Sequence, residues 1–150
     1  PLECSRKSEC MACYAVIDTN VLVSALISKN RASPTVKVIE AVLDGRIIPL
    51  YHADIIAEYD AVLRRKKFHL QPDTISTFLS VFTQFGLEVF PTPTGEILVD
   101  QDDLVFYEVA MERQQDNAYL VTGNMKHYPV RKFIVTPAQM MEILDGKSTE

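Results

Sequence analysis

Four polar residues of this chain have types and positions that could do metal-ion chemistry. Asp18 and Asn124 each follow an apolar run typical of a buried strand, Asp103 ends an acidic cluster, and Glu58 lies within a helical pattern. Carboxylate and amide oxygens are ligands that hard cations such as Mg²⁺ prefer, and a cation relieves the repulsion between clustered carboxylates. Such a cation polarises a phosphoryl oxygen and activates water. If the fold brings these residues together, they predict a divalent-metal site suited to phosphate chemistry.

Taken one at a time, three of these residues have ordinary structural explanations. A carboxylate at Asp18 would cap the helix that follows. Glu58 lies at the border of the buried face of its helix, and Gly-Asn, which ends at Asn124, is a common turn pair. Asp103 differs, because the helix after it is almost wholly apolar and would carry its charge toward the sheet. An unpaired charge there is costly, and a cation would remove that cost.

The elements that must position these residues alternate between strands and helices. Short apolar runs predict strands over residues 14–17, 47–51, 87–90, 119–122 and 133–135. Apolar residues at helical spacing predict helices over residues 21–27, 34–43, 53–66, 72–85, 103–114 and 137–144. This alternation is typical of an α/β domain with a mainly parallel sheet, whose ligands bind at the carboxyl ends of the strands. Asp18, Asp103 and Asn124 are therefore expected at one edge. Pro49 is expected at a sheet edge or a strand end.

The composition favours a single globular domain. The chain has 150 residues, of which 47% are hydrophobic and 23% charged. A chain of this length buries about two thirds of its unfolded surface, which is enough for a core without disulfides. No apolar run reaches the length needed to cross a bilayer. The net charge of −5 excludes a strongly basic nucleic-acid-binding coat but leaves room for a local basic patch.

The N-terminal segment is expected to lie outside this domain. Residues 1–10 carry no apolar stretch of a signal peptide, so we interpret them as a cloning remnant or a disordered lead, with natural translation starting at Met11. The single domain would then comprise residues 11–150. The three cysteines, all within the first 13 residues, form neither a disulfide framework nor a zinc pattern. Their arrangement suits a reducing cytoplasm.

At these residues the chain resembles the PIN-domain ribonucleases, especially the VapC-like bacterial toxins. The matching segments are 16–22 with Asp18, 55–59 with Glu58, 100–106 with Asp103, and 120–124 with Asn124. The resemblance extends over residues 11–144. It implies a three-layer α/β/α fold with a mainly parallel central sheet. It also implies a Mg²⁺- or Mn²⁺-dependent endoribonuclease that hydrolyses RNA phosphodiester bonds and leaves 5′-phosphate and 3′-hydroxyl ends.

The resemblance also implies roles for particular residues. Asp18, Glu58 and Asp103 would be the catalytic metal ligands. Thr19 or Asn20 would orient the first of these acids.

Asn124 departs from the pattern of the family, because many members have Asp at this position. The neutral side chain removes one negative charge, so a second metal ion should bind more weakly, and Asp100 or Asp102 would compensate. Asn124 would then assist catalysis, with Thr122 of the same segment in a supporting role. A subgroup of the family has Gly-Asn followed by Lys-His, as this chain does. The change therefore does not by itself mark an inactive enzyme.

Two groups of basic residues could hold RNA on this acidic protein. The first group ends the helix that carries Glu58, and the second follows Asn124. Their members are Arg64, Arg65, Lys66 and Lys67, and Lys126 and His127. Basic side chains on phosphates supply the sequence-independent part of affinity, although cations at a helix end also complement its dipole. The three histidines are too far apart in sequence to bind a metal together. We interpret them as surface or packing residues, His127 being the best candidate for a phosphate contact.

The resemblance implies an RNA substrate, a cognate antitoxin protein that blocks the site of a toxin-antitoxin pair, and, as an option, a homodimer. It places the protein in the cytoplasm. The competing interpretation is a catalytically weak or inactive PIN-like module that binds RNA or a protein partner, which Asn124 favours. An aspartyl-phosphate phosphatase also begins with an Asp after a strand. That chemistry needs a second Asp two residues later, where this chain has Asn20.

Overall fold

Five parallel strands form the central sheet. The computed structural model describes residues 12–147, so the expectation for residues 1–10 and Met11 lies outside the described residues. The described strands have the order β3-β2-β1-β4-β5, and every pairing is parallel. They are β1 (Cys13–Ile17), β2 (Ile47–Tyr51), β3 (Leu87–Glu88), β4 (Tyr119–Val121) and β5 (Ile134–Val135). The predicted α/β class with a mainly parallel sheet is confirmed.

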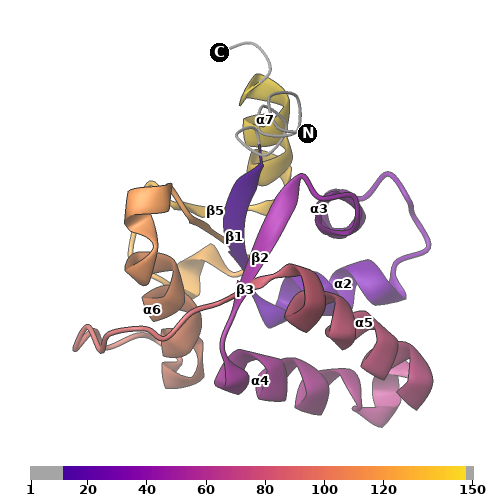
Figure 1. Ribbon diagram of the computed structural model, residues 1–150. Coiled ribbons are helices and arrows are strands. Elements are labelled where there is room, and N and C mark those ends of the chain that lie inside the picture. The colour runs from indigo at the N-terminus through magenta and orange to yellow at the C-terminus, as the bar shows by residue number, and fades with distance from the viewer. Residues whose placement is uncertain (1–11, 148–150) are drawn as a thin grey trace.

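Within residues 12–147, six α-helices surround the sheet. They are α2 (Thr19–Ile27), α3 (Pro34–Leu43), α4 (Ala53–Leu63), α5 (Pro72–Phe85), α6 (Leu104–Glu112) and α7 (Pro137–Lys147). The helix α6 packs on one face of the sheet and α3 on the other, with α2 beside α3 (Figure 1). The helix α5 lies along β2 and β3, and α7 packs on α3. This is the expected three-layer α/β/α arrangement. No helix in the described part of the chain is long and apolar enough to span a bilayer.

Several helix ends fall at residues whose backbone chemistry favours them. The helices α3 and α5 begin at Pro34 and Pro72, where a missing N–H and a fixed φ cost nothing. Gly86 ends α5, and a Cβ at this position would lie 2.4 Å from the backbone oxygens of both Phe82 and Pro49. Only glycine therefore allows α5 to pass this close to β2.

Several elements are shorter than the apolar pattern predicts, and α4 and β3 show why. The helix α4 ends at Leu63 rather than residue 66, and a short 3₁₀ turn, Lys66–Phe68, follows it. The reason is that the polar run after Leu63 offers nothing to bury on the inner face. The strand β3 has only two residues instead of the predicted 87–90. Val89 donates one more backbone hydrogen bond to Tyr51 over 2.8 Å, and the chain then leaves the sheet.

Pro49 does not lie on an edge strand, so this expectation is wrong. The strand β2 pairs with β1 on one side and with β3 on the other. The carbonyl oxygen of Pro49 lies beside Gly86, just before β3 begins. The nitrogen and the carbonyl of a strand residue point to the same side, and the first residue paired with β3 is Leu50. The missing N–H of Pro49 therefore falls where no partner strand has started, and no ladder bond is lost.

The strand order places a crevice between β1 and β4. The chain moves outward from β1 through β2 to β3 and then returns to β4 on the other side of β1. In such sheets ligands bind outside the carboxyl ends of the strands, at the point where the order reverses. The carboxyl end of β1 points toward the side where α2 and α4 begin, away from α7 (Figure 1).

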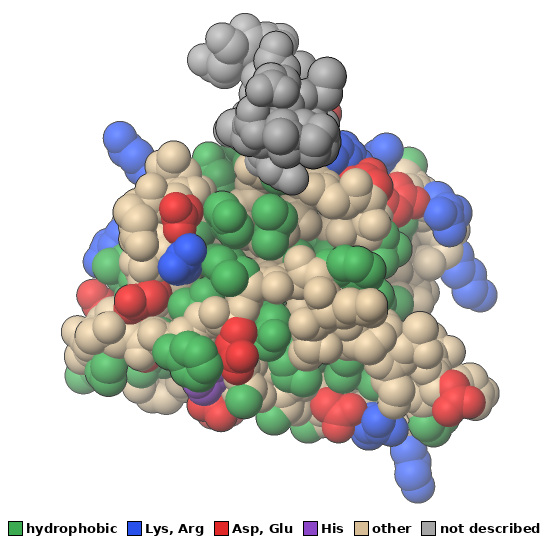
Figure 2. Space-filling model, in the orientation of Figure 1, with side chains coloured by type: hydrophobic (Ala, Val, Ile, Leu, Met, Phe, Trp, Pro, Cys, Tyr) green, Lys and Arg blue, Asp and Glu red, His purple; other side chains and the backbone are tan. Residues whose placement is uncertain are grey.

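The distribution of charged side chains agrees with the net charge. On the face shown in Figure 2, Lys and Arg side chains stand mainly toward the edges of the outline, with hydrophobic and acidic side chains between them. This face carries no continuous basic coat. On this face, attraction for a polyanion would have to come from a local group of cations.

Candidate active site

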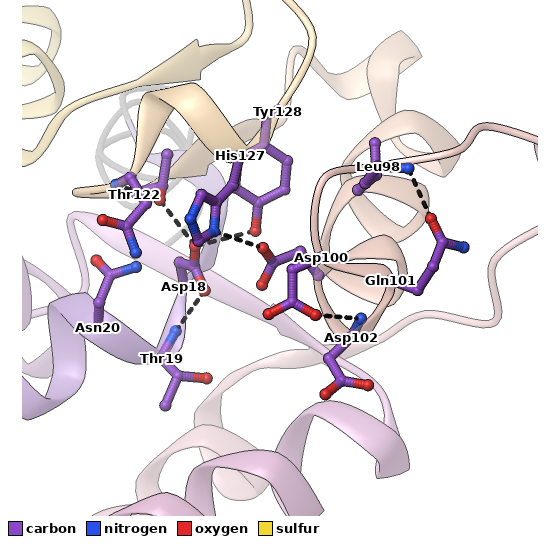
Figure 3. A network of polar contacts seen from close by, with 12 residues as sticks. Asp18, Thr19, Asn20, Leu98, Asp100, Gln101, Asp102, Thr122, His127 and Tyr128 are labelled. Atoms are coloured by element: carbon purple, nitrogen blue, oxygen red, sulfur yellow. Dashed lines mark hydrogen bonds and ion pairs between the residues drawn. The ribbon is translucent and has the colours of Figure 1, made fainter.

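The Asp18 side chain is buried at the carboxyl end of β1, where its oxygens accept three hydrogen bonds (Figure 3). The backbone N–H of Thr19 donates to Oδ1 over 2.8 Å. The hydroxyl groups of Thr122 and Tyr128 donate to Oδ2 over 2.7 and 2.9 Å. The carboxylate also lies at the N-terminus of α2, whose dipole favours negative charge. Its orientation is therefore set from three separate points of the chain.

A second contact ties the end of β4 to the start of α2. The Oδ1 atom of Asn20 accepts a hydrogen bond from the backbone N–H of Gly123 over 2.8 Å. Asn20 thus holds the loop after β4, while the backbone of Thr19 and the hydroxyl of Thr122 contact Asp18. A Cβ at position 123 would lie 2.9 Å from the same Asn20 oxygen. Glycine at this position therefore permits the close approach of the two loops.

Glu58 reaches the same region from α4. The neighbouring Tyr59 is fully buried, and its hydroxyl donates to the carbonyl oxygen of Ile17, the residue before Asp18. This contact fixes α4 against the end of β1. Burial, followed by the negative charges of Asp102 and Asp18, raises the pKa of Glu58. The carboxyl groups therefore lie close enough to repel one another.

A cavity of about 430 Å³ brings the acids together. Its wall includes the four acids Asp18, Glu58, Asp100 and Asp103, and also Asn124 and His127. The structure thus places on one cavity residues that are up to 109 positions apart in the sequence. Asp102 is exposed and does not line this cavity, but its charge acts on Glu58.

Asp103 is the acid whose protonation the surroundings change most clearly. Burial and then the negative charge of Asp18 raise the pKa of Asp103 to about 6, although a hydrogen bond from His127 opposes the rise. The Nδ1 atom of His127 lies 3.1 Å from Oδ2 of Asp103. The site therefore holds more negative charge than its own cations balance.

A compact group of possible metal ligands includes a residue that sequence reasoning left outside. Among the described residues, Asp100, Asp103 and His127 each offer one ligand atom, and these atoms lie within 4.8 Å of one another. Asp103 belongs both to this group and to the predicted set with Asp18 and Glu58. Histidine spacing alone does not indicate this role for His127, but its position one turn after Asn124 does, because it places His127 beside the same strand end.

The donor set fits a hard divalent cation. Four carboxylates line the cavity, and two of these carboxyl groups have raised pKa values. Thr19 also lines the cavity, and its hydroxyl oxygen is buried without a hydrogen-bond partner within residues 12–147. Oxygen ligands of this kind suit Mg²⁺ or Mn²⁺.

Tyr128 is the contributor that the sequence did not reveal. It is buried, and burial and then the charge of Asp18 raise the pKa of its hydroxyl, so it remains a proton donor to that carboxylate. The two residues are 110 positions apart. The residues around Tyr128 and the proline after it show no pattern that indicates a contact with Asp18.

The predicted basic residues divide between the site and its surroundings. Arg65 lines the acidic cavity and also a neighbouring cavity, of about 480 Å³, with Arg64 and Lys66. Arg64 is paired with Asp60 over 2.9 Å. The ammonium group of Lys67 lies 5.2 Å from the centre of the Phe68 ring. Lys126 is exposed in a short 3₁₀ turn, Met125–His127.

Comparison with known proteins assigns the family. The PIN domain matches residues 14–126. The chain belongs to the PIN-domain family. PIN domains are generally nucleases. An uncharacterized protein of Methanocaldococcus jannaschii, MJ1680, is 26% identical over 121 residues, which cover 79% of this chain and 75% of the relative.

The PIN match includes most of the candidate site but ends before two of its residues. Asp18, Glu58, Asp103 and Asn124 lie inside the matched range, whereas His127 and Tyr128 follow its last residue. The hydrogen bonds of these two residues to Asp103 and Asp18 come from the structure of this chain.

Proposed function

We propose that this protein is an endoribonuclease that depends on Mg²⁺ or Mn²⁺ and hydrolyses phosphodiester bonds of RNA. One observation carries the proposal: the buried, triply hydrogen-bonded carboxylate of Asp18 lines a cavity together with Glu58 and Asp103. Membership of the PIN family supports hydrolysis of nucleic acid. The raised pKa values of Glu58 and Asp103 support a cation as the missing partner.

In this proposal Asp18, Glu58 and Asp103 hold the metal ion. Asp100 is a further carboxylate on the same cavity, and Asn124 adds a neutral side chain with an amide oxygen. The ion, when bound, stabilises negative charge on the phosphoryl group and activates water.

The residues around the acids keep them in place. Thr122 and Tyr128 fix the orientation of Asp18, so that its charge needs no reorganisation when substrate arrives. Asn20 holds the loop that bears Asn124 through its contact with Gly123. His127 orients Asp103.

Cations beside the cavity hold the RNA backbone. Arg64 to Lys67 follow the helix that bears Glu58, and Lys126 and His127 follow Asn124. Their phosphate contacts would make binding weaker as salt concentration rises. Because RNA is an intracellular substrate, we place the protein in the cytoplasm.

We also infer that the protein is the toxin of a toxin-antitoxin pair. The support is the resemblance to VapC-like proteins at the four motif segments, within the PIN family. The cognate antitoxin would bind over the acidic cavity, and a homodimer is the further assembly that the resemblance suggests. Induced expression in a bacterial host should arrest growth, and expression of Asp18→Asn should not. Equal growth of both cultures would reject the toxin role and leave the nuclease proposal unaffected.

Asn124 favours a second function, that of a PIN-like module that binds RNA or a protein partner with little or no cleavage. Its amide supplies an oxygen but no charge where many relatives have a carboxylate. Titration with Mn²⁺ separates the two functions. A binding module should have little Mn²⁺ affinity, and its RNA binding should survive Asp103→Ala.

The proposed nuclease activity is tested with purified protein and a single-stranded RNA. Cleavage should require Mg²⁺ or Mn²⁺, stop with a chelator, and yield 5′-phosphate ends. Asp18→Asn should reduce the rate more than about 100-fold, since even residues that only orient metal ligands are worth about 10–100-fold. The control is Glu142→Gln, which removes an exposed acid from α7, away from the cavity. Cleavage at equal rates by wild type and Asp18→Asn would reject the proposal.

A further inference from the structure

The acidic cavity continues into a region with a different chemistry. Besides the acids, its wall contains the apolar side chains Val23, Ile27, Val62 and Phe68, with Arg65 among them. The volume of about 430 Å³ lies within the usual range of small-molecule sites, about 300–1,000 Å³. A metal site for a phosphate alone does not need this apolar part.

Helix geometry arranges the two chemistries along one groove. Asn20, Val23 and Ile27 share one face of α2, and from Asn20 to Ile27 the helix advances by about 10 Å. On the facing helix α4, which packs against α2, Val62 lies one turn after Glu58. Both helices therefore lead from acidic or amide groups near the strand ends to apolar side chains farther away.

An aromatic ring belongs to the apolar part. Phe68 lies in the 3₁₀ turn after α4, is only partly buried, and lines the cavity. The ammonium group of Lys67 lies over its ring. Because Phe68 lines the cavity, its ring offers a surface on which a nucleobase can stack, since every nucleobase has a π-face.

Cations follow the apolar part in space. Arg65 lines both this cavity and the neighbouring one, whose wall also includes Arg64, Lys66 and His69. The surface thus runs from anionic through apolar to cationic. A single-stranded RNA presents the matching series: a phosphate that needs a metal ion, a base, and a further phosphate. An apolar peptide would leave the acidic and the basic ends unmatched.

We propose that the groove between α2 and α4 binds one unpaired nucleobase next to the scissile phosphate, stacked on Phe68. This inference rests on the proposed function, because the acidic end is assigned to the phosphate. The apolar lining gives a modest preference among bases, since stacking reads the size of a base more than its hydrogen-bonding edge.

The binding test uses Asp103→Asn, which keeps RNA intact, and short oligoribonucleotides that carry 2-aminopurine at each position in turn. Stacking quenches this fluorescent base. Quenching should be confined to one position beside the cleavage site. Phe68→Ala added to Asp103→Asn should remove the quenching and weaken RNA binding by about 5- to 150-fold, the range of one base–aromatic stack. Ile27→Ala, at a side chain 46% exposed, should weaken binding less and keep the fold.

Two controls separate stacking from general damage. Phe68→Tyr keeps the ring and should keep the quenching. Phe90→Ala removes an aromatic side chain that is 71% exposed and lies outside the cavity, and it should change nothing. Undiminished quenching with Phe68→Ala would overturn the proposal. If no position is quenched, the proposal is also overturned. The side chain of a partner protein would then be the alternative occupant of the groove.

Cleavage mapping distinguishes this proposal from the proposed function. If wild type cuts RNA and Phe68→Ala shifts the base preference at the cut, both are supported. If wild type cuts and Phe68→Ala leaves the preference unchanged, only the base site fails. If wild type does not cut but quenching still depends on Phe68, the nuclease assignment fails and the base site stands.

Discussion

Two carboxylates of the same cavity are held in opposite ways. Asp18 is 4% exposed and accepts hydrogen bonds from Thr19, Thr122 and Tyr128. The side chain of Asp103 is 15% exposed, and its carboxylate contacts the ring of His127. Burial and then the charge of Asp18 raise the pKa of Asp103 to about 6. The fold therefore supplies three hydrogen-bond donors to the carboxylate of Asp18, whereas it disfavours the charged form of Asp103. A bound cation would favour that charged form.

The largest expected effect is that of Asp18→Ala on stability. Its removal leaves two buried hydroxyl groups without an acceptor, at a cost of about 1–3 kcal/mol for each. Asp103→Ala should lower stability little, because no such donors surround it. Urea unfolding of both variants in a chelator measures the difference. Equal losses would show that the two carboxylates are not held differently.

Metal binding should have the next largest effect. Mn²⁺ at about 100 times its Kd should stabilise the fold by about 2.7 kcal/mol. That corresponds to a rise in Tm of roughly 5–10 °C for a chain of this size. Thermal unfolding with and without Mn²⁺ measures it. Glu142→Gln should respond like wild type, whereas Asp103→Ala should respond far less. A full response in Asp103→Ala would exclude Asp103 from the metal site.

Tyr128→Phe should have a smaller effect and sharpen the role of the donors. The change removes one hydrogen bond to Asp18, which costs about 1 kcal/mol of stability and lowers the cleavage rate by about 10-fold. The matched control is Tyr51→Phe. The hydroxyl of Tyr51 donates an exposed hydrogen bond of 3.4 Å to the backbone oxygen of Thr83. Unfolding and RNA cleavage are measured for both. A cleavage rate unchanged by Tyr128→Phe would show that Thr19 and Thr122 suffice to orient Asp18.

The smallest effect is expected for Asp103→Asn in metal-free protein. The pKa of Asp103 rises from 3.8 to about 6 on folding. Its contribution to stability is therefore fully present below about pH 4 and is lost as the pH rises through 6. At pH 7 the charged carboxylate destabilises the fold, so Asp103→Asn should raise Tm by about 1–3 °C. Thermal unfolding of wild type and Asp103→Asn in a chelator between pH 4 and 8 tests this prediction. A difference in Tm that stays constant over this pH range would contradict it.

The order of elements and part of the site could be predicted from the sequence. Strand β1 and helix α5 follow from apolar runs with clear ends, because burial of a continuous apolar face decides their structure. Asp18 and Asn124 could be placed together because each follows a strand and parallel strands share one carboxyl edge. Asp103 could be added because the apolar helix after it carries its charge toward the sheet. The local sequence pattern was sufficient to predict a residue's structure wherever its neighbours in sequence also determine its surroundings.

The rest depends on contacts that no local pattern encodes. Tyr128 reaches Asp18 across 110 positions, and His127 reaches Asp103 across 24. Pro49 is tolerated inside the sheet only because β3 starts one residue later. The helix α4 ends at Leu63 because the cations after it have no apolar side chain to bury on the inner face. In each case the deciding partner comes from another element.

The contact between Gly123 and Asn20 has a consequence for how this site can vary. A methyl group at position 123 would lie only 2.9 Å from the Asn20 oxygen, so Gly123→Ala would push the amide aside and strain its bond. Because this amide is the end of a side chain and can move, the change should loosen the link between the two loops without altering any acid. Position 123 should therefore respond to side-chain size by degrees, unlike position 86, where a Cβ would meet two backbone oxygens.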